Sequence, residues 1–67
     1  MNNPIPGATY RHHRTRNLYT VQGCLPIKLD GQWVQQGATV YVSNETGDAY
    51  VRLTPDFLDA FERALEG

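Results

Sequence analysis

The sequence predicts a mainly β fold with one C-terminal helix, built as a small SH3-like barrel or a strongly curled antiparallel sheet. Three observations lead to this prediction. Short runs rich in β-branched and aromatic residues alternate with turn residues over positions 9–53. An Asp-Gly pair at 30–31 separates two of these runs. Beyond Leu53 the spacing of apolar residues changes to that of a helix.

Four of the predicted strands form two hairpins. Residues 27–29 and 32–34 flank Asp30-Gly31, which is typical of a type I′ turn because both central residues need a positive φ. Residues 39–43 and 49–53 flank a second loop, which carries Gly47. Residues 9–12 and 18–22 are the first two strands, and in the polar turn between them Asn17 is best suited to a left-handed conformation.

The predicted helix covers residues 55–66. Thr54 is expected as its N-cap and Pro55 as its first helical residue. Apolar residues then recur at helical spacing and would form one stripe against the sheet: Phe57, Leu58, Phe61, Ala64 and Leu65.

The length and composition predict a single domain without a disulfide. The chain has 67 residues and one cysteine, so residues 8–67 are expected to form one domain after a flexible arm at 1–7 that contains two prolines. No signal-peptide pattern or long apolar run occurs. A cytoplasmic location is therefore expected.

Charge is distributed unevenly along the chain. The net charge of −1 argues against a general nucleic-acid binder, but residues 1–25 contain three arginines and no acid. Arginine forks bind phosphate or carboxylate, and aromatic rings offer stacking surfaces. One candidate ligand-binding surface follows: Tyr10, Arg11, His13, Arg14, Arg16 and Tyr19. The favoured alternative is a solvated hairpin tip whose charge is balanced by acids elsewhere, for example Glu62 or Glu66.

The sequence predicts no catalytic residue, metal site or cofactor. His12 and His13 are adjacent, and adjacent side chains of a strand point to opposite faces, so they cannot chelate one ion. Cys24 follows Gly23 and precedes Leu25 and Pro26, a setting in which a free thiol is expected to be a small buried apolar group. No neighbouring base would activate it as a nucleophile.

Three aromatic residues on predicted strands have two interpretations: Trp33, Tyr41 and Tyr50. A core position is favoured because large rings close small β folds, and the alternative is a groove that binds a partner protein.

Several short motifs resemble a small bacterial and phage family of unknown function. Its members open roughly with Gly-x-Tyr-Arg-His-Tyr-Lys-Gly and continue with Tyr-x-Val-x-Gly. The matching segments are Pro6-Gly7, Tyr10-Arg11-His12, Leu18-Tyr19-Thr20-Val21-Gln22-Gly23, Val40-Tyr41, Thr46-Gly47 and Tyr50-Val51-Arg52-Leu53, leading into Phe57. Here His13 replaces the family's aromatic residue, and the following turn is longer and lacks its glycine. Because the family has no agreed chemistry, the resemblance implies a fold and not an activity.

The sequence as a whole favours a small, non-enzymatic binding module for a partner protein, and the resemblance suggests a phage or prophage accessory protein. The alternative function is an anion binder that holds nucleic acid or a nucleotide-like ligand on the hairpin at residues 11–16. Short strands with unpaired edges also favour a homodimer.

Overall fold

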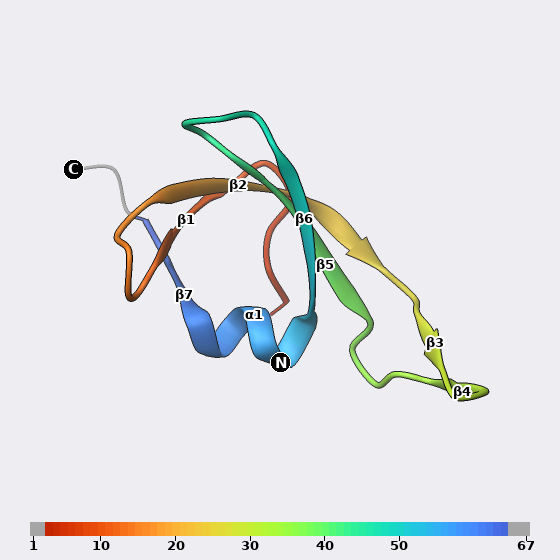
Figure 1. Cartoon of the computed structure of the whole chain (residues 1–67). Coiled ribbons are helices and arrows are strands. Elements are labelled where there is room, and N and C mark those ends of the chain that lie inside the picture. The colour runs from red at the N-terminus through yellow and green to blue at the C-terminus, as the bar shows by residue number, and fades with distance from the viewer. Residues whose placement is uncertain (1–2, 65–67) are drawn as a thin grey trace.

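The computed structural model describes residues 3–64 and consists of one curled sheet, a small hairpin and a helix (Figure 1). The five-stranded antiparallel sheet has the order β6-β5-β2-β1-β7, and β3 pairs with β4 alone. The elements are β1 Thr9–His12, β2 Leu18–Leu25, β3 Lys28–Leu29, β4 Gln32–Trp33, β5 Ala38–Ser43, β6 Ala49–Leu53, α1 Thr54–Ala60 and β7 Phe61–Arg63. The prediction of a mainly β fold with a C-terminal helix is confirmed. Of its two forms, the curled sheet is observed, and the described strands do not close into a barrel.

The β3–β4 hairpin has the predicted turn. Asp30 and Gly31 have φ values of 51° and 74°, and the Val34 N–H donates a 2.8 Å hydrogen bond to the Ile27 carbonyl. The turn after β1 differs from expectation, because Arg16 and not Asn17 has the left-handed conformation, with a φ of 68°. The Asn17 carbonyl accepts a bond from the His12 N–H. This bond fixes Asn17 opposite His12 and moves the left-handed position one residue earlier.

The helix is shorter than predicted. The expected helix at 55–66 ends at Ala60, where Phe61 turns to extended backbone with φ −127° and ψ 153°. Residues Phe61–Arg63 instead pair with β1, with His12 opposite Phe61 and Tyr10 opposite Arg63. The strand gives hydrogen-bond partners to the free edge of β1, which a longer helix would leave unpaired. Leu65 lies outside the described residues.

The start of the helix also differs from expectation. Leu53 occupies the N-cap position without a side-chain hydrogen bond, and Thr54 is a buried helical residue. The Thr54 hydroxyl lies 3.0 Å from the Thr39 hydroxyl of β5. This contact connects the first turn of α1 to β5.

The helix α1 connects the end of β6 to β7 and lies across the open side of the curled sheet (Figure 1), and the hydrophobic core includes residues from this helix and from the strands. The core consists of Tyr10, Val21, Tyr41, Phe57 and Phe61.

A core position is the favoured interpretation for three strand aromatics, and only Tyr41 is buried. Tyr41 is 5 % exposed, whereas Tyr50 is 45 % and Trp33 is 67 % exposed. Trp33 lies on the β3–β4 hairpin, which projects away from the curled sheet (Figure 1). Its ring packs against the ammonium group of Lys28, 4.9 Å from the ring centroid.

Within the segment 1–7, which the sequence predicts to be a flexible arm, residues 3–7 contact the sheet. Pro4 is buried, the Ile5 N–H donates to the Tyr10 hydroxyl at 3.0 Å, and the Gly7 N–H donates to the Val21 carbonyl at 2.8 Å. The segment therefore covers one end of the core.

Among residues 3–64, the structure contains no helix with the length and apolar composition needed to cross a lipid bilayer.

Candidate functional site

Two hollows open side by side on the concave side of the sheet and share His12 and Arg52. The first, here called the aromatic pocket, has a volume of about 220 Å³ and is lined by His12, Thr15, Tyr19, Tyr41, Tyr50, Arg52 and Phe61. The second, here called the arginine hollow, has a volume of about 310 Å³ and is lined by His12, His13, Arg14, Arg52, Asp59 and Ala60.

Strand register assembles the wall of the aromatic pocket. Tyr41 of β5 lies opposite Tyr50 of β6, and their rings stack with centroids 5.7 Å apart. Side chains two residues apart on a strand share a face, so Arg52 follows Tyr50 on the concave side. Tyr19 meets Tyr41 edge to face at 5.5 Å, and Phe61 lies 5.1 Å from the Tyr41 ring. The pocket therefore has rigid aromatic walls anchored in the core.

Arg52 places a positive charge in the lining of the aromatic pocket. Its Nε–H donates to the Tyr41 hydroxyl at 2.9 Å, and its Nη1 donates to Asp56 at 3.0 Å. The guanidinium carbon also lies 5.4 Å from the centroid of the Phe61 ring. The hydrogen bond to Tyr41, with a further one to Asp56, raises the pKa of Arg52 although partial burial opposes the change. Arg52 is thus a fixed cation.

His12 lies at the boundary between the two hollows as a neutral ring. Its Nδ1 accepts hydrogen bonds from the backbone N–H groups of Arg14 at 3.2 Å and Thr15 at 3.3 Å. A nitrogen that accepts a bond carries no proton, so the neutral imidazole holds its proton on Nε2. Burial lowers the pKa of His12, and the charges of Arg52, Arg14 and His13 lower it further.

This environment predicts that acid destabilises the fold through His12. The unfolded chain binds a proton at the ordinary pKa of 6.5, whereas the folded chain resists protonation. The free energy of unfolding should therefore fall as the pH drops below about 6.5, because the unfolded state binds more protons there. His12→Asn keeps an acceptor oxygen for the turn but cannot titrate in this range.

Urea unfolding of the wild type and of His12→Asn between pH 7.5 and pH 5 tests this prediction. In the variant, the free energy of unfolding should depend much less on pH over this range than it does in the wild type. His13→Asn is the matched control, because it removes only the last of the four causes that lower the pKa of His12 and should keep most of the His12 contribution. An unchanged pH dependence in His12→Asn would contradict the prediction.

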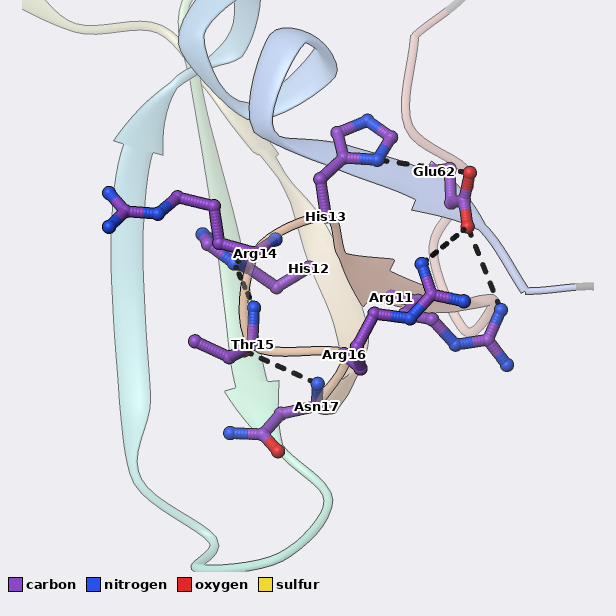
Figure 2. Close-up of polar contacts among 8 residues, drawn as sticks. All are labelled: Arg11, His12, His13, Arg14, Thr15, Arg16, Asn17 and Glu62. Carbon is purple, nitrogen blue, oxygen red and sulfur yellow. Dashed lines mark hydrogen bonds and ion pairs between the residues drawn. The ribbon is translucent and has the colours of Figure 1, made fainter.

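The predicted arginine surface divides into separate groups in the structure. Glu62 of β7 lies across from Arg11 and forms ion pairs of 3.7 Å with Arg11 and with Arg16, and its Oε1 lies 3.8 Å from the Nδ1 of His13 (Figure 2). This arrangement matches the interpretation of a hairpin tip balanced by Glu62, while Glu66 lies outside the described residues.

Of the remaining members of that predicted surface, Arg14 and Tyr19 each line one of the hollows, and Tyr10 lines neither. Arg14 points away from Glu62 (Figure 2) and lines the arginine hollow. Tyr19 lines the aromatic pocket. Tyr10 is 6 % exposed and belongs to the core, so it cannot offer a stacking surface to a ligand.

Sequence reasoning missed Arg52, His12 and Phe61 as members of one site. For Arg52, the period of two in β6 places it on the same face as Tyr50, and this pattern was visible in the sequence. Phe61 could not be found in this way, because its place depends on a strand that the helical pattern concealed.

Cys24 is exposed and not buried as expected. Its Sγ lies 3.5 Å from the Thr39 hydroxyl. Within the part of the chain that the structure describes, no group of three or more His, Cys, Asp or Glu side chains is arranged to hold a metal ion.

Compared with protein families, with curated proteins and with solved structures, the chain shows no match.

Proposed function

We propose that this chain is a small non-enzymatic binding module that holds a partner protein at the aromatic pocket. The observation that carries the proposal is the pocket itself, in which rigid aromatic walls meet the fixed cation of Arg52. Binding sites for proteins commonly combine buried aromatic anchors with a few placed polar groups. Tyr50 is the exposed ring of this set and offers the surface on which an incoming side chain would pack.

The Trp33 surface is the competing protein-binding site. Trp33 is more exposed than Tyr50, but it lies on a two-stranded hairpin with two residues in each strand. A hairpin of this size is only marginally stable in isolation, so it offers a less rigid surface than the pocket. The pocket loses less conformational entropy on binding, and for this reason we favour it.

A second function, anion binding, is supported by Arg14. Among the described residues Arg14 has no carboxylate within ion-pair distance, and it lines the arginine hollow together with Arg52. Two guanidinium groups can hold one phosphate or carboxylate. Asp59 lines the same hollow, and it weakens this function by adding a negative charge.

Selection from a displayed library of random short peptides tests the proposal, followed by affinity measurements on one labelled peptide that is enriched. Tyr50→Ala should weaken binding about tenfold or more, because it removes an aromatic anchor. Tyr50→Phe retains the ring and should bind as the wild type does. Trp33→Ala should also leave binding unchanged, and amide spectra establish that each variant is folded.

Other results would favour the competing sites. Binding that survives Tyr50→Ala but is lost in Trp33→Ala would place the site on the β3–β4 hairpin. Binding that is lost in Arg14→Glu and falls steeply as salt is added would indicate an anion site. The absence of any enriched peptide would contradict the proposal of a peptide-binding pocket.

From the sequence we also propose that the fold is SH3-like and that the chain belongs to the bacterial and phage family. We further propose that it is a phage or prophage accessory protein and that it is located in the cytoplasm. The motif around Tyr10-Arg11-His12 is the support for the family.

A further inference from the structure

The two edges of the five-stranded sheet differ in how they are protected. β7 has only three residues, and two of them, Glu62 and Arg63, are exposed and charged. Such residues prevent a sheet edge from pairing with another chain. β6 has five residues, no proline and a single charge. That charge belongs to Arg52, which faces the concave side and is bound to Asp56. β6 is therefore the unprotected edge.

The backbone groups that β6 turns outward can be identified from its pairing with β5. The Ser43 N–H donates to the Asp48 carbonyl, and the Thr54 N–H donates to the Gly37 carbonyl. Hydrogen-bonded and non-hydrogen-bonded pairs alternate along an antiparallel ladder. Tyr50 and Arg52 therefore bond to β5 in the observed register, whereas the N–H groups of Ala49, Val51 and Leu53 point away from the sheet. In residues 3–64 no strand pairs with this outer side.

The sequence of β6 is complementary to itself in an antiparallel arrangement. β6 runs from Ala49 to Leu53, so Val51 is its middle residue. A two-fold axis at Val51 places Val51 opposite the same residue of a second copy and Ala49 opposite Leu53. It also places Tyr50 opposite Arg52 in a non-hydrogen-bonded pair, where side chains lie closest. An arginine against a tyrosine ring is a favourable contact, and no like charges face each other.

We propose that β6 pairs with β6 of a second copy of this chain, forming a homodimer with one continuous sheet. Val51 exchanges two backbone hydrogen bonds with Val51 of the other copy, and the exposed side chains of Val51 and Leu53 form an apolar strip with their counterparts. A pair of five-residue strands buries less area than a stable complex requires. The dimer is therefore weak, and it forms at high protein concentration.

This dimer goes beyond the proposed function, because it brings two aromatic pockets together. Tyr50 and Arg52 line each pocket, and across the axis Tyr50 of one copy would meet Arg52 of the other. Two pockets on one sheet could hold two segments of one partner, and the linked binding events would raise the overall affinity. Loss of the dimer would leave each pocket able to bind alone, so the two proposals can fail separately.

Sedimentation and nuclear magnetic resonance of the full chain test the dimer. As the concentration rises from micromolar to millimolar, the average mass should approach twice that of the chain. The amide resonances of Ala49 and Val51 should shift with concentration, whereas that of Tyr50, bonded within the sheet, should shift little. A sample mixed from two isotope labels should give an Hα–Hα contact between Tyr50 of one copy and Arg52 of the other. Within one strand these atoms are separated by about 6.6 Å of chain rise.

Two variants and one control locate the interface. Val51→Pro removes the outward N–H but no bond to β5, and it should keep the chain monomeric at millimolar concentration. Val51→Lys, a substitution that protects natural edges, should have the same effect and decides the question if the proline variant does not fold. Arg63→Pro removes an outward N–H from the opposite edge and should dimerise as the wild type does.

The proposal is overturned by a monomer at millimolar concentration or by dimerisation that persists in Val51→Lys. An association that Arg63→Pro abolishes would assign the interface to β7 instead.

Discussion

Phe57→Ala should leave the chain largely unfolded at room temperature. Phe57 is fully buried, and its ring stacks on Phe61 with centroids 4.3 Å apart and meets the edge of Tyr10 at 5.3 Å. Truncating such a phenylalanine costs about 3–5 kcal/mol. In a domain of 67 residues a single hydrophobic core rarely supplies more than about 3–5 kcal/mol of stability, so this loss is as large as the total. Alanine is a better helix former than phenylalanine, so the loss would come from packing and not from the helix.

Leu58→Ala is the matched control for this prediction. Leu58 lies next to Phe57 on the same helix and is only partly buried. Its truncation should therefore cost less than that of Phe57. Urea unfolding followed by circular dichroism measures both changes. A Phe57→Ala protein with the stability of the wild type would refute the assignment of the aromatic core.

Gly37→Ala should also lower the free energy of unfolding strongly, second only to Phe57→Ala. Gly37 has a φ of 65°, and a Cβ atom at this position would collide with the carbonyl oxygen of Leu25 in β2. The left-handed conformation alone costs about 1–2 kcal/mol for a residue with a side chain. Relieving the collision would also displace the Gly37 carbonyl, which accepts the Thr54 N–H at 3.0 Å. We expect a total loss of about 3 kcal/mol or more.

Gly31→Ala separates the two causes of this loss. Gly31 also has a positive φ, of 74°, but a Cβ atom there would meet nothing within 4 Å. Its substitution should cost only the conformational part, about 1–2 kcal/mol. Thermal or urea unfolding of the two variants under the same conditions measures the difference. Equal losses would show that the contact with Leu25 contributes nothing to the effect.

The sequence by itself determined the strands and turns whose causes are local. Asp30-Gly31 specifies its hairpin because these two residues tolerate positive φ more readily than most others. The alternation of apolar and polar residues places β5 and β6 correctly, and Pro55 with Asp56 marks the first turn of α1. Each of these features depends on residues close together in the chain, so an isolated sequence contains the information.

Only the tertiary structure decided where the helix ends. Phe57 and Phe61 are four residues apart, a spacing that favours a helix, and both are buried in the structure. The chain nevertheless leaves the helix at Phe61 because the edge of β1 offers backbone partners to residues 61–63. Glu62 then lies opposite Arg11, and its carboxylate forms ion pairs with two of the three arginines of the predicted surface, Arg11 and Arg16.

The composition of the candidate site also depends on the tertiary structure. Its walls come from β1, β2, β5, β6 and β7, and residues as distant in sequence as His12 and Phe61 meet there with ring centroids 4.9 Å apart. Trp33 and Tyr50 had the same two interpretations in the sequence, but the strand order places Tyr50 in the pocket and Trp33 on a separate hairpin. Strand order is set by long-range hydrogen bonds and core packing, which local residue patterns do not encode.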